Sequence, residues 1–377
     1  MSELVAGITQ SPPASLPKAF NHDKAAPSGP HETNDFAGRC HCGAVQFSVN
    51  LPVASLPLRS YFCHCSICRY SQGTYARMGV VLPPGIEPDW TGGSMSEKVA
   101  KYKIPGSPSP RLFCSTCGST IGGVGEDGTT TGGVPVKGQW CLMVSLFDDK
   151  FWHHCAHAFP KSVPGGGLLD WLLHPGAAAA GAQQEETLWY TPDERDFSVA
   201  AEPEHAADGT ERLRAECHCG GVSFTIPRPT QDILDDEYLR KYVSPLDPTK
   251  WKAMLDLCRD CGRSSGANVV PWMLVPRTYK SSEPTTRGFC SVCGATVFGA
   301  TKHREPTAGQ AVLNVAMGLL RAPEGVRAEN WVTWRAGKHS WLEDAKAYDE
   351  EFTVSLVEGH RKWALETYGE APEFDIV

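Results

Sequence analysis

Two cysteine motifs occur twice along the chain and constrain its fold more than any other feature. RCHCGAVQFSV at 39–49 matches ECHCGGVSFTI at 216–226, and RLFCSTCGSTIGG at 111–123 matches RGFCSVCGATVFG at 287–299. The first matched cysteines of the two motifs are 177 and 176 residues apart. Two nearly equal offsets indicate a tandem duplication, so we expect two similar domains in one chain.

The stretches between and before the motifs set the expected domain boundaries. Residues 1–35 are rich in Pro, Ala, Ser and His and are predicted to be a disordered tail, and 174–212 has the composition of a linker. The first copy then covers 36–173 and the second copy 213–377, which suits a chain of 377 residues. Within the linker, TLWY is expected to dock on a domain surface.

Short apolar runs bounded by Gly and Pro predict a mainly β fold. AVQFSV, GVSFTI, MGVVL and CLMVSLF are short and apolar, and several alternate with polar residues. Each copy is therefore predicted to be a small antiparallel β domain organised around cysteines. The one strong helix signal is C-terminal, at 341–369, with acidic residues early, basic residues late and a Gly at its end.

The second copy is longer in its middle. Cys65 and Cys258, which occupy equivalent places, are 193 residues apart, 16 more than the first motif pair. The additional residues fall at 231–251, which is predicted to be a short helix followed by a turn broken by Pro. We expect this segment to contact the first copy.

The repeated motifs supply four thiols to each copy. A Cys-x-Cys pair and a Cys-x-x-Cys pair together fit a closed tetrahedral zinc site of structural type, and the repetition of the pattern strengthens this interpretation over a disulfide or redox role. Gly43 and Gly118 follow the pairs, where a tight turn directs backbone N–H groups toward the thiolates. The predicted ligands are Cys40, Cys42, Cys114 and Cys117 in the first copy, and Cys217, Cys219, Cys290 and Cys293 in the second.

A further motif, FCHCSICRYSQG at 62–73, provides three cysteines, Cys63, Cys65 and Cys68. Three protein ligands with one open position are typical of catalytic zinc. The alternative is a closed site completed by a distant residue. In an extended segment His64 points away from Cys63 and Cys65, so it is not the expected fourth ligand. The other candidates lie in FWHHCAHAF and are His153, His154, Cys155 and His157.

The second copy departs from this motif. LDLCRDCGRSSG at 255–266 has Asp256 in the place of Cys63. Asp256, Cys258 and Cys261 remain candidate zinc ligands because a carboxylate can bind zinc. Mixed carboxylate–thiolate sites are less usual, however. The sequence alone favours the interpretation that duplication relaxed the need for zinc ligands here and that this copy is now structural.

Composition limits the classes of partner. The net charge is −8 and no run of Lys or Arg is present, which argues against a nucleic-acid-binding surface. We expect no membrane segment, because no apolar run approaches 18 residues, and no targeting segment. The 15 cysteines then suggest a reducing, cytoplasmic location, where clustered cysteines bind metal more often than they form disulfides.

The three motifs in this order resemble the glutathione-dependent formaldehyde-activating (GFA) family, which also includes centromere protein V. RCHCGAVQF, CHCSICRYSQG, RLFCSTCGSTI and the later VSLFDDK, HCAHAF and DWL carry the resemblance in the first copy. The second copy is similar more weakly, from Glu216 to about Trp341. The resemblance implies two tandem β-tent domains, each with a structural zinc, and a catalytic zinc held by Cys63, Cys65 and Cys68.

The resemblance also implies carbon–sulfur lyase chemistry, in which formaldehyde is joined to glutathione or another thiol. Arg69 and Arg111 are candidates to bind a substrate carboxylate, and His157 is a candidate acid or base. In the second copy, ENWVTW at 329–334 has no histidine. We therefore expect the first copy to be the catalyst. The alternatives are a non-catalytic zinc scaffold that binds a protein, and a tailoring enzyme of secondary metabolism that uses the same zinc site.

Overall fold

The computed structural model describes most of the chain between residues 32 and 376. The described residues are 32–104, 107, 109–126, 137–172, 189–190, 198–199, 201–277, 285–301 and 311–376. We call 32–172, together with Trp189 and Tyr190, the first half, and 201–376 the second half. The predicted tail, up to residue 31, and most of the predicted linker lie outside the described residues.

The first half contains two sheets. In the smaller sheet the order is β1-β2-β5, and in the larger one it is β11-β10-β3-β4-β9-β8-β7-β6. The strands are β1 (Thr33–Arg39), β2 (Gln46–Pro52), β3 (Leu58–Cys63), β4 (Arg77–Val81), β5 (Asp89–Trp90), β6 (Val99–Tyr102), β7 (Arg111–Cys114), β8 (Thr120–Val124), β9 (Trp140–Met143), β10 (Trp152–Ala158) and β11 (Trp189–Tyr190). The helices are α1 (Ser66–Gln72), α2 (Ser94–Lys98), α3 (Leu168–Trp171) and the 3₁₀ turns η1 (Val53–Ser55), η2 (Thr91–Gly93), η3 (Val144–Leu146) and η4 (Pro160–Ser162).

The second half also contains two sheets, with strand orders β12-β13-β14 and β17-β18-β19-β16-β15-β20. The strands are β12 (Glu204–His205), β13 (Glu211–Glu216), β14 (Ser223–Pro227), β15 (Trp251–Asp256), β16 (Val270–Arg277), β17 (Thr285–Phe289), β18 (Thr296–Thr301), β19 (Ala311–Ala316) and β20 (Val332–Trp334). The helices are α4 (Gln231–Asp235), α5 (Arg259–Ser265), α6 (Leu342–Tyr368) and the 3₁₀ turns η5 (Leu239–Tyr242) and η7 (Met317–Leu319).

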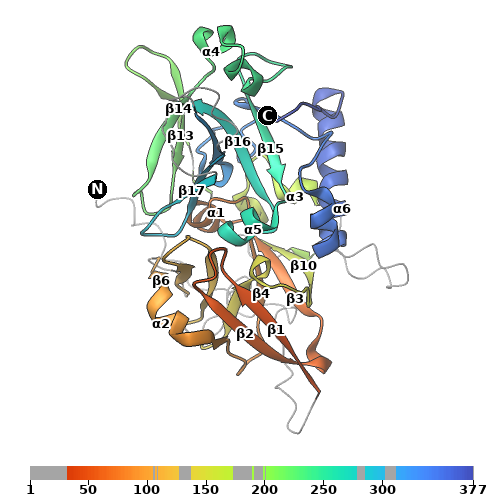
Figure 1. Cartoon of the computed structure of the whole chain (residues 1–377). Helices are drawn as coiled ribbons and strands as arrows, with labels where there is room; N and C mark the ends of the chain where they lie inside the picture. Colours follow the sequence, from red (N-terminus) through yellow and green to blue (C-terminus); the bar gives the residue numbers. More distant parts are fainter. Residues whose placement is uncertain are drawn as a thin grey trace.

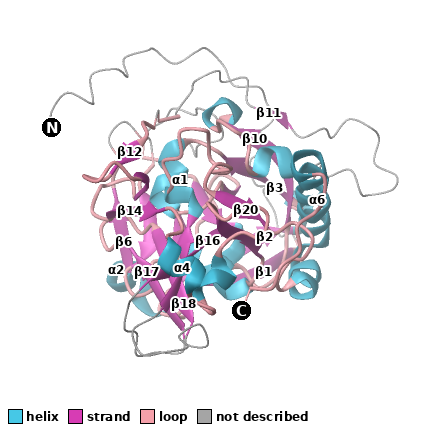
Figure 2. Cartoon of the chain, turned by 90° about the horizontal axis from the view of Figure 1, so that it is seen from above, coloured by secondary structure: helices cyan, strands magenta, loops and turns pink. Residues whose placement is uncertain are grey.

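Equivalent strands occupy the same places in the two larger sheets. The order β10-β3-β4-β9-β8-β7 of the first half corresponds, strand by strand, to β20-β15-β16-β19-β18-β17 of the second. The mainly β prediction is confirmed, and Figure 2 shows strands throughout the molecule with α6 along one side. Most neighbouring strands pair antiparallel, as predicted, but β3 pairs in parallel with β10 and β15 in parallel with β20. Each of these two parallel pairs joins strands that are far apart in sequence, so no short-range turn signal could reveal it.

Two boundaries differ from the sequence-based expectation. Strand β1 begins at Thr33, inside the expected tail, and β12 and the start of β13 lie inside the expected linker. From the TLWY stretch, Trp189 and Tyr190 form β11, which pairs in parallel with β10.

The C-terminal helix α6 packs on the first half as well as on its own. The ring of Trp171, on α3, lies 4.5 Å from that of His360 and 5.5 Å from that of Trp363, between ring centroids. At a kink in the helix, the buried carboxylate of Asp349 forms an ion pair with Lys150 over 2.6 Å and lies 3.3 Å from His154. Helix α6 therefore ties the two halves together.

The additional segment 231–251 has the predicted form, with α4 and η5 followed by a turn. Its position differs from the expected contact with the first half. Tyr242 of η5 packs on Leu274 and Val312 of its own half, and Figure 1 shows α4 at the end of the molecule away from the first half. The apolar residues of this segment thus complete the core of the second half, a role that the sequence cannot distinguish from an interface between halves.

Helices α1 and α5 lie between the halves in Figure 1. The end of α1 contacts the second half, and the end of α5 contacts the first half in the same way. Each ends at a glycine with positive φ, Gly73 at 81° and Gly266 at 82°. A Cβ added at Gly73 would lie 2.2 Å from the carbonyl oxygen of Thr296, and one at Gly266 would lie 3.0 Å from that of Thr120. The halves are thus related by an approximate two-fold arrangement that needs close backbone contact at both glycines.

We expect Gly73→Ala to destabilise the protein more than Gly85→Ala. Both glycines have φ near 80°, so alanine costs about 1–2 kcal/mol at either position. A Cβ at Gly85 meets no atom within 4 Å, whereas at Gly73 it overlaps Thr296, which adds about 1–3 kcal/mol. Urea unfolding of both variants measures the difference, and equal losses of stability would contradict the close contact between halves.

Candidate metal centres

In each half, one cysteine pair lies at a turn of the smaller sheet and the other at a turn of the larger sheet, and the two pairs come together. The sulfur atoms of Cys40, Cys42, Cys114 and Cys117 all lie within 4.8 Å of one another, as do those of Cys217, Cys219, Cys290 and Cys293. We call these the first and second four-cysteine clusters. The glycines that follow the four pairs all have φ between 73° and 78°; they are Gly43, Gly118, Gly220 and Gly294.

The spacing of the sulfur atoms fits a tetrahedral zinc ion. Zn–S bonds of about 2.3 Å place the sulfurs of a tetrahedron about 3.8 Å apart. The distance is 3.8 Å between Cys42 and Cys114, and 3.5 Å between Cys219 and Cys290. Backbone N–H groups of Val45 and Val222 donate to Cys40 and Cys217, as they do to bound thiolates. Both four-cysteine clusters are consistent with metal binding.

Cys63, Cys65 and Cys68 form a third group, the three-cysteine cluster, where β3 leads into α1. Their sulfur atoms are within 4.8 Å of one another, and all three side chains are buried. The Cys65 sulfur caps α1 by accepting a hydrogen bond from the backbone N–H of Cys68. The end of β3 fixes Cys63, and the start of α1 fixes Cys65 as its cap and Cys68 in its first turn.

Among the described residues, no fourth ligand joins the three-cysteine cluster. His153, His154, Cys155 and His157, the candidates for a closed site, lie outside the group. The ring of His64 turns to β10, where its Nε2 lies 2.7 Å from Nδ1 of His157. This placement agrees with the prediction that His64 points away from the thiols.

Two guanidinium groups face the thiols. Arg111 donates from Nη2 to the sulfur of Cys68 over 3.3 Å. Arg77, which motif spacing did not reveal, is buried on β4 directly opposite Cys63. Hydrogen bonds from Cys63 and Cys65 hold the pKa of the Cys68 thiol well below its ordinary value, and the two arginines lower it further. The arrangement favours a thiolate at Cys68.

The remaining candidates of the first half lie beside the cluster. Arg69 is buried, and its Nη1 donates to the backbone carbonyls of His64 and Ser162, each over 2.6 Å. Burial lowers the pKa of His157 to about 3 and also lowers the pKa of His64, so both rings are neutral near pH 7. Arg69 and His157 thus hold the loop that carries the thiols.

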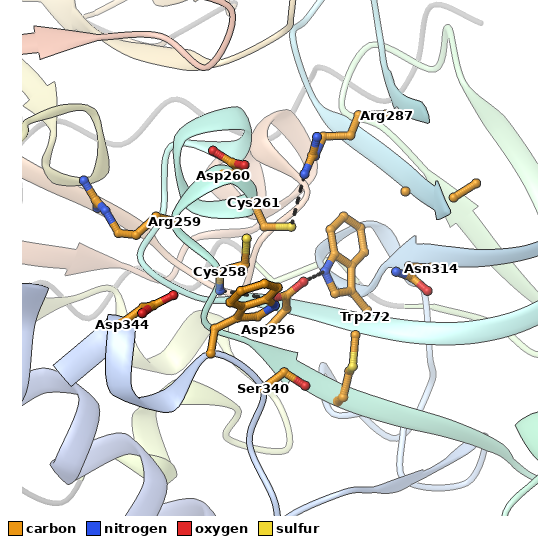
Figure 3. A pocket seen from close by; sticks show the side chains of 14 residues that line it. Asp256, Cys258, Arg259, Asp260, Cys261, Trp272, Arg287, Asn314, Ser340 and Asp344 are labelled. Atoms are coloured by element: carbon orange, nitrogen blue, oxygen red, sulfur yellow. Dashed lines mark hydrogen bonds between the residues drawn. The ribbon is translucent and has the colours of Figure 1, made fainter. Parts of the chain in front are cut away.

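Asp256, Cys258 and Cys261 occupy the equivalent place in the second half, and we call them the aspartate–cysteine cluster (Figure 3). Their ligand atoms also lie within 4.8 Å of one another. Asp256 accepts hydrogen bonds from the backbone N–H of Cys258 and from Nε1 of Trp272. A hydrogen bond with Cys261 lowers the pKa of Cys258 to about 7.

In each half, a histidine of the four-cysteine cluster motif contacts the other half at its helix α1 or α5. The Nδ1 of His218, between two cysteines of the second four-cysteine cluster, lies 2.8 Å from the Tyr102 hydroxyl, and the backbone N–H of His218 donates to the carbonyl of Tyr70. In the opposite direction, His41 lies 3.5 Å from Arg287 and 3.9 Å from Asp260. The second half therefore contacts the surroundings of the three-cysteine cluster, through a loop that carries its own four-cysteine cluster.

Residues 35–150 match the family model described as glutathione-dependent formaldehyde-activating enzyme. That range includes the first four-cysteine cluster and the three-cysteine cluster complete. The second half repeats the clusters and the strand order outside the matched range.

A curated relative agrees with this match. A protein of Halomonas elongata with the provisional name glutathione-dependent formaldehyde-activating enzyme is 35% identical over 86 residues. The alignment covers 22% of this chain and 52% of the relative, so the chain spans about half the length of the curated relative it matches.

A helix that spans a bilayer needs about 20 consecutive, mainly apolar residues. Among the described residues, no helix meets this requirement in both length and hydropathy.

Proposed function

We propose that the first half is a zinc-dependent enzyme of the GFA type, which joins a thiol to a small carbonyl compound or cleaves the adduct, with its reaction centre at the three-cysteine cluster. The observation that carries this proposal is the group of three buried thiols without a fourth described ligand, inside the range of the family match. Three protein ligands leave a coordination position for a reactant. The proposed reaction is carbon–sulfur lyase chemistry, with glutathione or another thiol as one reactant.

Zinc at this cluster would polarise a carbonyl oxygen or stabilise a substrate thiolate. The protein residues must balance the negative charge of three thiolates. Arg111, which donates to Cys68, and Arg77, which lies opposite Cys63, supply this positive charge. Within the described part of the chain, no acceptor reaches Nε or Nη2 of Arg77. These N–H groups are suited to hold a carboxylate or a developing oxyanion of the substrate.

The reaction balances without a further reactant. The substrate thiolate sulfur attacks the carbonyl carbon, an S–C bond forms, and the C=O π electrons move to oxygen. That oxygen takes up the proton that the thiol lost, which gives an S-hydroxyalkyl product. Breakdown of the adduct is the same sequence in reverse.

We further propose that the two halves are tandem GFA-like domains, the first beginning near Thr33 with β1 and the second near Glu204 with β12, and that a second structural zinc lies at the second four-cysteine cluster. The shared strand order and the matching clusters support this. The second half would then stabilise the surroundings of the three-cysteine cluster through the hydrogen bond from His218 to Tyr70.

Magnetisation-exchange NMR with isotope-labelled formaldehyde and glutathione tests the proposed reaction. The zinc-loaded protein should accelerate exchange between free formaldehyde and its glutathione adduct above the spontaneous rate. The same experiment with cysteine and with a simple alkyl thiol shows whether glutathione itself is needed. No acceleration with any thiol would contradict the proposed function.

A further inference from the structure

The second half contains a pocket that the proposed reaction does not use. We propose that Asp256, Cys258 and Cys261 bind a metal ion at the floor of this pocket, and that Arg287 binds the carboxylate of a small organic ligand beside it. The pocket lies in the other half from the three-cysteine cluster, so the proposal does not depend on the chemistry proposed there.

A cavity of about 510 Å³ opens onto the aspartate–cysteine cluster (Figure 3). Ligand pockets typically measure about 300–1,000 Å³, so this volume suits a small molecule. Three groups of the lining matter for the argument: the cluster itself, the arginine Arg287, and the aromatic side chains Trp272 and Trp341.

The side chain of Trp272 donates a hydrogen bond to Asp256, and among the described residues the first half has no equivalent donor at this place. The indole N–H of Trp272 donates to Oδ2 of Asp256 over 3.1 Å, and the backbone N–H of Cys258 donates to Oδ1 over 2.9 Å. In the first half, Cys63 stands in the place of Asp256 and Gly79 in the place of Trp272, as the register of the two strand pairs shows. Asp256 is 7% exposed, and burial alone requires donors to a carboxylate. Two donors, one to each oxygen, also fix its orientation, as partner groups do for a carboxylate that binds a metal.

The ligand atoms of the cluster are also positioned for a metal. They lie within 4.8 Å of one another, and the side chains of Cys258 and Cys261 are only partly buried, so the site can be reached from the cavity. Zinc accepts carboxylate oxygen together with thiolate sulfur, and three protein ligands leave a place for a ligand atom. A metal held this way would face the cavity.

Arg287 supplies positive charge at the same place. Its Nη2 lies 3.9 Å from the sulfur of Cys261, as Arg111 approaches Cys68 in the first half. Among the described residues, no carboxylate forms an ion pair with Arg287, and its Nη1 lies 3.5 Å from the ring of His41. A guanidinium in this situation can bind a carboxylate through two N–H groups.

Trp341 indicates which kind of group the ligand carries beside its carboxylate. It lines the cavity, is 58% exposed, and has φ of +64°, a conformation that costs a non-glycine residue energy and is often found at functional sites. Its ring offers a surface for a planar or apolar group. Asp260 and Asp344 line the same cavity, so a second negative charge on the ligand would be repelled. The expected ligand is a small monocarboxylate with a planar or apolar part.

The metal is tested by counting cobalt and zinc in the full-length protein. Cys258→Ser should lose one ion per chain relative to the wild type, and Cys65→Ser should lose a different one, so that the double variant loses two. Cys155→Ser, which changes a thiol outside every cluster, should lose none. An unchanged metal count in Cys258→Ser would overturn the proposed metal, whatever the outcome of the activity assay on the first half.

A second variant keeps the test valid if Cys258→Ser fails to fold. Trp272→Phe retains an aromatic ring but removes the donor to Asp256. It should weaken binding of that one ion about 10–100-fold in competition with a chelator, as expected for a residue that orients a metal ligand. An unchanged affinity would overturn the argument from Trp272.

The organic ligand is tested with benzoate and benzamide as a matched pair in saturation-transfer NMR on the zinc-loaded protein. Benzoate should bind and benzamide should not, and Arg287→Gln should abolish the benzoate signal. Failure of benzoate to bind, or equal binding to Arg287→Gln, would overturn the assignment of Arg287.

Discussion

Cys65→Ser is expected to abolish turnover and to remove one zinc ion while leaving the fold intact. The Cys65 sulfur lies within 4.8 Å of those of Cys63 and Cys68, so its loss takes one of three ligands from the proposed reaction centre. The first four-cysteine cluster uses other residues, and serine can still cap α1 in place of Cys65. Thiol–aldehyde exchange, zinc content and the melting temperature of the purified variant provide the measurements.

Two further variants show whether the loss of turnover is specific to the three-cysteine cluster. Cys155→Ser should retain activity, because Cys155 lies outside every cluster. Cys258→Ser changes the equivalent position of the second half and should affect turnover much less than Cys65→Ser. If Cys258→Ser abolishes turnover and Cys65→Ser does not, the roles of the two halves are reversed. If neither matters, a non-catalytic zinc scaffold becomes the better account.

Cys117→Ala is expected to cause the largest loss of stability. The four sulfurs of the first four-cysteine cluster join the β1–β2 turn to the turn between β7 and β8, and the ligands Cys42 and Cys114 are 72 residues apart in sequence. Structural zinc contributes about 10–16 kcal/mol in small zinc domains, which equals or exceeds the whole stability of most domains, about 5–15 kcal/mol. The first half of Cys117→Ala should therefore be unfolded or insoluble at room temperature.

Calorimetry and solubility assays measure this effect in Cys117→Ala and Cys40→Ala. Cys155→Ala is the control. Treatment of the wild type with a strong chelator should also lower its melting temperature and solubility. A normal melting temperature in either cluster variant would count against a structural metal at this place.

The elements that depend on local signals were predicted well from the sequence. The helix expected at 341–369 is α6, Leu342–Tyr368, and the glycines after the cysteine pairs have the positive φ that tight turns require. The cysteine groupings follow from motif spacing, because a metal needs all its ligands within one small sphere.

The features that depend on contacts between distant segments could not be predicted. Arg77 is a lone charge in an apolar strand, but only the pairing of β3 with β4 places it opposite Cys63. The contact of His218 with Tyr102 joins the two halves, and so does the ion pair of Asp349 with Lys150. No local pattern in the sequence marks these pairings, because the packing of distant segments creates them.

The zinc content of the full-length protein, purified without added chelator, tests the central claim most directly. We expect one ion in each four-cysteine cluster, one in the three-cysteine cluster and one in the aspartate–cysteine cluster, which makes about four per chain. Cys65→Ser should then carry one fewer than the wild type. Ions in the two four-cysteine clusters alone, with no change in Cys65→Ser, would contradict the proposal that the three-cysteine cluster is a zinc reaction centre.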